Sequence, residues 1–549
     1  MPIKYYGIYL CYAPTIDLRG EGLGRYLASF LKGASQRQDI HFIIACPSWS
    51  REQLTELLLA ESVPQNNFSI ASPKTFPAAL RLYNHWKRYR GKPKKPSWLG
   101  RLYCKAINYK ASTVEKTLNH LAQTDSYLIL GLRLLPLALL VLASAPFLPI
   151  FITILALSSA PKNIRRLLGR HNQIIVSMWS RWHRMLSQPK NDTLSTRMYQ
   201  SMESAEIKRM HHMIEGMPEV RAWYSPTAFW PSFNLIDAPK LMCVPDVVLS
   251  DFAIGFSNVG GDRVLYNFEQ IEKAIRQGTN FVTYSKDVKF NTLINKYLIR
   301  DKDISVIHHA PNNLKPWISI IGLDNPEAAS YGYSRSLLYG AIKGKCGTDY
   351  SYGFDNINFK FLFYASQLRA NKNLLTLLRA YEYLLRTHKI NHKLLLTCNP
   401  NAIESVKSFV IEKSLENDVL FLKGLQVNEL AACYKLADLA INPSLSEGGC
   451  PFTFTEALSV DTPVVMAKIP VTEEVLTDPR LQEMTFFDPY DWQDLASRIE
   501  WALDNRDELL TVQRKTYAQL AQRTWADVVD EHLQVLERIS EGYPEKTQA

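Results

Sequence analysis

The sequence predicts an α/β protein built from parallel, Rossmann-like sheets, and two stretches carry this prediction. Near the N-terminus an apolar strand at residues 5–12 leads through a Gly-rich turn into a helix and then into a second strand at residues 40–46. In the last quarter, residues 439–476 show the same alternation of strand, loop, helix and strand. Units of this kind place their strands in parallel and cover the sheet with the crossover helix.

Length and composition are those of a globular protein with more than one domain. The 549 residues suffice for two or three full cores, and 46% of them are hydrophobic. Eight cysteines are scattered without a C-x-x-C pair, which favours a reducing cytoplasm over a disulfide framework or a structural metal. The first ten residues, MPIKYYGIYL, lack the apolar core of a signal peptide, so we expect no export.

The net charge of +10 comes from two local segments. Residues 81–105 contain nine basic residues and no acid, and residues 162–190 contain seven basic residues and again no acid. The rest of the chain is therefore net negative. No recognised nucleic-acid fold is visible, so we expect an anionic membrane surface and no nucleic acid as the partner of these segments.

Between the basic segments lies an uncharged stretch, residues 134–160. Its 27 residues exceed the roughly 20 that a membrane-spanning helix needs. However, Pro136, Pro146 and Pro149 interrupt it, which favours two short helical arms that enter the membrane from one side. The basic flanks place both ends in the cytoplasm. A buried helical pair within a large core is the alternative. We expect an insert over about residues 80–200 that contacts the membrane.

The N-terminal Gly-rich turn is a candidate ligand site. Gly20, Gly22 and Gly24 precede a helix, an arrangement that lets backbone N–H groups approach an anion. Their spacing is not that of a dinucleotide fingerprint, and a helix entry that needs small residues is the alternative. Further strands are expected within residues 221–233, 240–252 (through Asp246), 280–284 and 304–310.

The second domain is expected to begin with a strand at residues 359–365. Arg369 and Lys372 then lie at the turn into a helix, where two cations suit a diphosphate; a solvated helix start is the alternative. Residues 322–358 are rich in Tyr and Gly with little periodicity, which indicates a long insert at the hinge. An amphipathic segment at residues 528–539 ends the chain.

The loop of the last β-α-β unit carries two carboxylates. Glu447 stands beside Gly448 and Gly449, and Glu456 lies in the helix that follows. Carboxylates accept hydrogen bonds from sugar hydroxyls, and a helical side chain points back towards the N-terminal end of its helix. We therefore expect both glutamates at one ligand. An ordinary surface loop before an α/β helix is the alternative.

This stretch resembles the signature of family 4 of the retaining glycosyltransferases. The shared parts are two glutamates around a Gly-containing loop, the A-L-x-x-x-T-P-V-V pattern at residues 457–465 and the I-P-x-x-x-E-V pattern at residues 469–475. Three features depart from the family. Eight residues separate the glutamates where the family has seven, Gln367 stands at the usual arginine, and Pro245 stands at the usual histidine.

The resemblance implies the GT-B fold of two facing Rossmann-like domains and the retaining transfer of a hexose from a nucleotide sugar. By the same resemblance Glu456 would bind the ribose, Glu447 the donor sugar, and Arg369 with Lys372 the diphosphate. It implies no metal and no cofactor besides the nucleotide sugar; Asp301 and Asp303 are read as a solvated turn. The further residues expected at the donor are Gly448, Gly449, Cys450, Pro451 and Phe452, and those expected along the cleft are Gly20, Gly22, Gly24 and Asp246.

The patterns S-Q-x-R-x-x-K-N at residues 366–373 and F-T-F-T-E-A at residues 452–457 resemble bacterial mannosyltransferases of surface polysaccharide synthesis. They imply GDP-mannose as donor, a lipid-linked saccharide as acceptor and a place at the cytoplasmic face of the inner membrane. A catalytically silent subunit that anchors an assembly complex is the alternative. The expected domains are an acceptor-side domain (1–310), a linker with an insert (311–358), a nucleotide-sugar domain (359–525) and a C-terminal helix with tail (526–549). The resemblance implies that this helix returns to the first domain.

Overall fold

The computed structural model describes residues 3–14, 18, 22–74, 194–252, 262–345, 359–367, 369–400 and 403–543. Most of the expected insert (residues 80–193), its apolar stretch at residues 134–160 and Gly20 lie outside these ranges. Within them, no helix combines the length and the apolar character that crossing a membrane requires.

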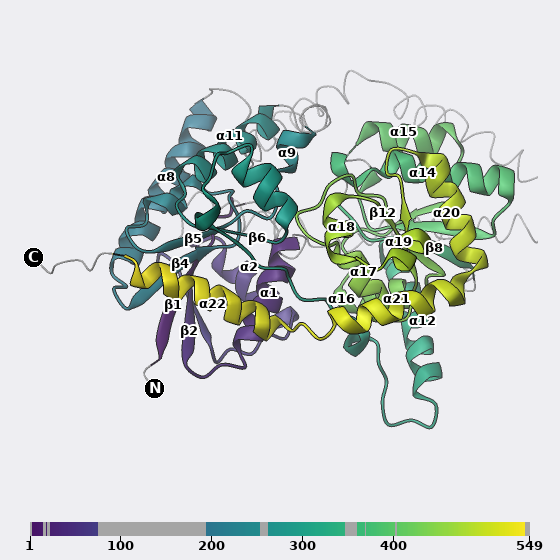
Figure 1. Cartoon of the computed structure of the whole chain (residues 1–549), viewed down its shortest axis with the longest axis horizontal. Coiled ribbons are helices and arrows are strands. Elements are labelled where there is room, and N and C mark those ends of the chain that lie inside the picture. Colours follow the sequence, from purple (N-terminus) through teal and green to yellow (C-terminus); the bar gives the residue numbers. More distant parts are fainter. Residues whose placement is uncertain are drawn as a thin grey trace, which may run out of the picture. The chain divides into compact units, whose positions relative to one another are not determined.

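The N-terminal half contains a seven-stranded parallel sheet with the order β3-β2-β1-β4-β5-β6-β7. Figure 1 labels β1, β2, β4, β5 and β6 of this sheet. The order reverses between β1 and β4, and ligands of open α/β sheets bind beyond the carboxyl ends of the strands at such a reversal. The strands are β1 Lys4–Tyr9, β2 Ile40–Ala45, β3 Phe68–Ala71, β4 Val220–Ser225, β5 Lys240–Cys243, β6 Phe281–Thr283 and β7 Ile304–Val306.

Two strands of this sheet are shorter than the apolar runs predict. β4 ends at Ser225 and β5 ends at Cys243, and Pro226 and Pro245 follow soon after. Proline has no N–H to give to a ladder, so a central strand stops near it. Asp246 consequently lies in the loop beyond β5, which corrects the expectation of a strand through it. The helices and short helical turns of this half are α1 Gly22–Ala34, α2 Arg51–Ala60, α8 Leu194–Glu215, η3 Pro231–Leu235, α9 Val248–Asp251, α11 Asp262–Gln277, η4 Val288–Ile294, η5 Asp301–Asp303 and η6 Lys315–Trp317.

The C-terminal half contains a second parallel sheet with its own hydrophobic core. Its order is β10-β9-β8-β11-β12-β13, formed by β8 Lys360–Tyr364, β9 His392–Leu396, β10 Val419–Phe421, β11 Leu439–Asn442, β12 Val464–Ala467 and β13 Phe486–Phe487. Two parallel Rossmann-like sheets confirm the predicted fold class. The helical elements are α12 Pro326–Lys345, η8 Ala370–Lys372, α14 Leu374–Tyr383, η9 Leu384–His388, α15 Glu404–Glu412, α16 Val427–Leu436, α17 Phe452–Leu458, α18 Pro470–Val475, α19 Pro479–Thr485, α20 Trp492–Asp504, α21 Arg506–Leu520 and α22 Trp525–Glu541.

Helix α12 occupies much of the segment that we expected to be irregular. It packs on α16, and its buried residues are Ser330, Ser334, Leu338, Ala341 and Ile342. These positions have helical spacing, but the first two are polar. The apolar stripe is therefore too weak to stand out in the sequence.

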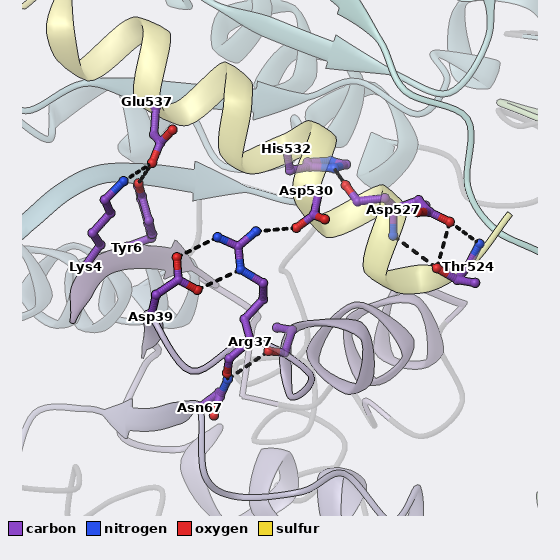
Figure 2. A network of polar contacts seen from close by, with 12 residues as sticks. Lys4, Tyr6, Arg37, Asp39, Asn67, Thr524, Asp527, Asp530, His532 and Glu537 are labelled. Atoms are coloured by element: carbon purple, nitrogen blue, oxygen red, sulfur yellow. Dashed lines mark hydrogen bonds and ion pairs between the residues drawn. The ribbon is translucent and has the colours of Figure 1, made fainter. Parts of the chain in front are cut away.

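The last helix, α22, packs against the first sheet and helix α1 and shares the first hydrophobic core (Figure 1). Figure 2 shows the polar contacts along it. The Arg37 guanidinium donates to both carboxylate oxygens of Asp39 at 2.7 and 2.6 Å and to Asp530 of α22 at 2.6 Å. Lys4 Nζ reaches Glu537 Oε1 at 2.5 Å. These ion pairs fix the position of α22 along the sheet.

The centre of α22 carries a fully buried histidine, His532. Its ring lies 5.2 Å, centroid to centroid, from the rings of both Phe30 and Tyr224, and its Nδ1–H donates to the Val528 carbonyl at 2.7 Å. Figure 2 shows His532 on α22. Burial lowers the pKa of His532 to about 4. The histidine therefore packs as a neutral aromatic ring at neutral pH.

Candidate functional site

The turn after β8 and the loop after β11 meet because β8 and β11 are neighbouring parallel strands. Asn371 of the turn holds the loop on both sides. Its Nδ2 donates to the Ser446 carbonyl at 3.0 Å, and its own carbonyl accepts from the Leu445 N–H at 2.8 Å. The carboxyl ends of adjacent strands thus bring the expected cations next to the expected carboxylate.

Lys372 and Glu447 form an ion pair, with both side chains mostly buried. Burial acts to lower the pKa of Lys372, but the charge and hydrogen bond of Glu447 together with Tyr364 raise it, so the pKa of the lysine lies above its ordinary value. Lys372 is therefore charged at neutral pH. Its ammonium is the kind of group that an incoming anionic ligand can take over from the carboxylate.

Arg369 and Asp246 belong to the same electrostatic group. Arg369 donates from Nη2 to Gln367 Oε1 at 2.7 Å, so the residue at the family's arginine position orients the arginine two residues further on. The pKa of Asp246 is raised, first by burial and then by the Glu447 charge, while Arg369 and Lys372 oppose the shift. The loop after β5 in the first sheet thus lies within electrostatic reach of the predicted donor residues.

Gly448 lies directly against the first sheet's loop. A Cβ placed on it would stand 2.0 Å from the Pro245 carbonyl oxygen and 2.5 Å from its carbon, so a side chain does not fit there. The Ser285 hydroxyl donates to the Gly448 carbonyl at 3.0 Å. The glycine is therefore required for a close backbone approach between the loops that follow β5, β6 and β11.

The residues after Gly448 are packed rather than exposed. Phe452 begins α17 after the N-cap residue Pro451, and its ring lies 4.3 Å from that of His309. Burial lowers the pKa of His309 to about 4, so its ring is neutral at neutral pH. Burial, followed by the Glu447 charge, raises the pKa of Cys450 to about 12, so this thiol is inert. Gly449 packs against Tyr284 and His309.

Glu456 is 2% exposed and lies at a second group of contacts. Its Oε1 atom is 3.1 Å from Arg25 Nη2 and accepts a hydrogen bond from Asn312 Nδ2 at 3.1 Å. The Glu456 charge raises the pKa of Arg25, and burial followed by that charge raises the pKa of Tyr434 well above its ordinary value. A buried carboxylate held by a charged and a neutral donor is fixed in orientation.

Arg25 and Asn312 were missed by the sequence reasoning. Arg25 directly follows Gly24, and a Cβ on Gly24 would stand 2.3 Å from the Leu18 carbonyl oxygen, so this glycine is needed where the turn folds onto α1. The position of Arg25 directly after the Gly-rich turn was the only sequence feature that could have indicated its place at the ligand site. Asn312 had none, since it lies in the irregular segment after β7.

Other predicted residues stay apart from these groups. Nothing surrounds the position of a Cβ on Gly22. Asp301 pairs with Lys289 at 2.8 Å, and Asp303 pairs with Arg300 at 2.7 Å. Throughout the described ranges, no three His, Cys, Asp or Glu side chains gather as metal ligands would.

The sequence of the second sheet matches a known family. Residues 355–522 match the profile described as glycosyl transferases group 1. This part of the chain is therefore similar to the group 1 glycosyl transferases. A stretch of 115 residues is also 33% identical to the O-antigen chain mannosyltransferase RfbU of Salmonella typhimurium. It covers 20% of this chain and 31% of that relative, so the two are comparable over about a third of the relative's length.

Solved structures are similar in fold to nearly the whole chain, beyond the residues that match the family profile. HepE of Anabaena, crystallised with UDP and glucose, has a TM-score of 0.51 at 12% identity, with 97% of this chain and 100% of that one covered. The N-terminal domain of a Candida albicans trehalose-6-phosphate phosphatase has a TM-score of 0.54 at 11% identity, covering 98% and 97%. The fold is GT-B.

Proposed function

We propose that this protein is a glycosyltransferase that moves a hexose from a nucleotide sugar to an acceptor hydroxyl. The observation that carries the proposal is the pair of carboxylate groups, Glu447 with Lys372 and Glu456 with Arg25, at the loop of the region that is similar to the group 1 glycosyl transferases. HepE, which shares the fold, holds UDP and glucose in its crystal structure. This supports a nucleotide sugar as the donor.

The donor's diphosphate would replace Glu447 as the partner of Lys372, with Arg369 as the second cation. Charge develops on the diphosphate as it leaves, and fixed cations stabilise it most in that state. The released Glu447 carboxylate would then accept hydrogen bonds from the sugar hydroxyls. The Lys372–Glu447 ion pair would thus hold both groups in position until the diphosphate replaces it.

Glu456 would accept from the ribose hydroxyls of the nucleotide. Arg25 and Asn312 both contact its Oε1 atom, which holds the carboxylate in one orientation. Hydrogen bonds to a charged group are worth about 1.5–3 kcal/mol, so a fixed carboxylate is a strong anchor for the nucleotide. The first sheet's helix α1 would in this way contribute to donor binding.

In the transfer step, the bond from the anomeric carbon to the diphosphate breaks and a bond to the acceptor oxygen forms. The acceptor's proton would pass to the departing phosphate oxygen, so the step needs no protein base. We propose retention of the anomeric configuration and independence of metal on the resemblance to family 4. His309 is neutral and packed against Phe452, which fits a wall of the site.

GDP-mannose is our proposed donor and a lipid-linked saccharide our proposed acceptor, at the cytoplasmic face of the inner membrane. The likeness to an O-antigen chain mannosyltransferase supports mannose as the transferred sugar. The nucleotide, the acceptor and the location are proposed on the resemblance of the sequence patterns alone. The fold does not determine the donor or the acceptor, because proteins of one fold act on many different substrates.

The test is a thermal-shift screen of GDP, UDP and ADP sugars on the full-length protein, followed by an assay of sugar transfer or release. We expect one nucleotide class to raise the melting temperature and its sugar to be released. Glu456→Ala should weaken that shift, while Glu447→Ala should mainly reduce turnover. Nucleotide binding without any turnover would instead identify a silent glycosyltransferase-like subunit, and no binding would refute the proposal.

A further inference from the structure

A pocket lined by basic residues lies on the first sheet, at the carboxyl end of β3. Its volume is about 440 Å³, and it is lined by Pro73, Lys74, Lys208, Arg209 and His212. Small-molecule sites have volumes of about 300–1,000 Å³, so this pocket has the size of a ligand site. Every lining residue except the proline is basic.

Helix α8 is held firmly over this end of the sheet. Its Met210 and Ile214 are buried, while Lys208 and His212 lie about one turn apart on the opposite face. On the side towards the sheet, the His211 ring lies 6.0 Å from that of Tyr9, the last residue of β1. Helix α8 thus lines the pocket with basic side chains on one face and packs into the hydrophobic core with the other.

The nearby acids do not cancel the charge of the pocket. Buried Glu206 accepts from Arg209 Nη1 at 2.7 Å and from the Ser48 N–H at 2.7 Å, which ties α8 to the loop after β2 and fixes the arginine. Glu215 lies 3.5 Å from His212 and is largely exposed. Among the described side chains, no carboxylate pairs with Lys74 or Lys208, whose charges remain for a ligand.

We propose that this pocket binds a phosphoryl group, either a monophosphate or a diphosphate, at a site separate from Arg369 and Lys372. Lysine and arginine together suit an anion with several oxygens, because the arginine offers a planar fork and each lysine a mobile charge. The carboxyl edge of the strands is also where ligands of such sheets bind. The chain beyond Lys74 continues into the basic segment at residues 81–105.

The phosphoryl group has two possible sources, the headgroup of an anionic phospholipid or the phosphate of a phosphate-linked acceptor. Only the second source rests on the proposed transferase function. Either source would place the N-terminal domain next to an anionic lipid or lipid-linked molecule. The binding of the group itself needs no transfer reaction, so it can be measured alone.

The experiment is lysine-reactivity mapping by mass spectrometry on the full-length protein, with inorganic pyrophosphate as the probe. Pyrophosphate should protect Lys74 and Lys208 from an amine-reactive reagent and leave Lys273, an exposed lysine on α11, unprotected. In the Lys208→Glu variant the protection of Lys74 should require at least about tenfold more pyrophosphate, because a charged hydrogen bond is replaced by repulsion. The Lys273→Glu variant, with the same change of charge, should behave as wild type.

Two further arms separate the sources. Protection by phosphatidylglycerol vesicles but not by phosphatidylcholine vesicles assigns the site to a lipid headgroup, whereas protection by a soluble prenyl diphosphate but not by vesicles assigns it to an acceptor. Absent protection of Lys74 and Lys208, or equal protection of Lys273, overturns the proposal. Lys372 provides the distinction from the proposed function: failure of every nucleotide sugar to protect it speaks against the transferase and leaves the pocket result standing.

Discussion

Gly448→Ala is the most direct perturbation of the contact between the two sheets' loops. The new methyl group would lie 2.0 Å from the Pro245 carbonyl oxygen and 2.5 Å from the carbonyl carbon. These are backbone atoms, so they cannot rotate away as a side chain would. Overpacking of this kind costs about 1–3 kcal/mol, and we expect the loop after β11 to withdraw from the loop after β5 rather than accept the clash.

The withdrawal should also separate Glu447 from Asp246 and weaken the Ser285 hydrogen bond to the Gly448 carbonyl. If turnover requires the close arrangement, its rate should fall roughly 5- to 150-fold, the equivalent of that free energy. The melting temperature should change little, because each sheet keeps its own core. The assay is sugar transfer or release from the donor found by screening, beside thermal unfolding.

The matched control is Gly340→Ala in α12, where a Cβ would meet open space. Alanine in a helix interior stabilises by about 0.5–1 kcal/mol relative to glycine, so this variant should keep full turnover with an equal or higher melting temperature. Wild-type turnover in Gly448→Ala would refute the required close approach. An equal loss in both variants would show that any added methyl group has this effect.

Three further predictions concern charged and titratable groups. Lys372→Ala should weaken binding of the nucleoside diphosphate by roughly 10- to 100-fold and lower turnover with it, since it removes a charged donor. Arg25→Ala should lower nucleotide affinity several-fold without unfolding the protein, because Glu456 loses its charged partner but keeps Asn312. The pKa of His532 is about 4 in the folded protein and 6.5 when unfolded, so between these values the unfolded chain binds more protons. Stability should therefore fall as the pH drops from about 6.5 to 4, by up to about 3 kcal/mol.

The Lys372→Ala and Arg25→Ala predictions are measured by titration calorimetry with the nucleoside diphosphate. Lys468→Ala is the control for the loss of a positive charge, because Lys468 is an exposed lysine of the domain that contains Lys372. Unchanged affinity in Lys372→Ala would contradict its role at the diphosphate. Arg25→Lys should restore part of the affinity if charge is what Glu456 needs. For the third, the melting temperature is followed from pH 7 to 4.5, where His532→Phe should show a shallower decline than wild type. Equal slopes would mean that other groups cause the loss.

The sequence determined the fold class and the loop that carries the candidate site. Short apolar runs bounded by turn residues are local signals, so most strands were found to within a few residues, and the β-loop-α-β unit at residues 439–476 follows directly from them. The pairing of strands by topology then explains why Lys372 and Glu447 meet, since the turn after β8 and the loop after β11 lie at the same edge.

The prediction from local patterns was wrong at two strands and one helix. The true ends of β4 and β5 depend on prolines just beyond them. The buried face of α12 includes serines and an alanine, so it does not show as an apolar stripe in the sequence. Only α12 depends on the element it packs on, α16, whereas β4 and β5 end near prolines that the sequence itself contains. Composition reports the average polarity of a segment but not the neighbour that covers it.

Tertiary structure alone decided which residues complete the two carboxylate groups. Arg25 and Glu456 are far apart in the sequence, and no local sequence pattern around either residue predicts that the two form an ion pair. The same holds for Gly448, whose need for glycine comes from the Pro245 carbonyl. Periodicity specifies which face of an element is buried, whereas contacts between distant loops depend on how complete sheets are placed, and only the folded chain contains that information.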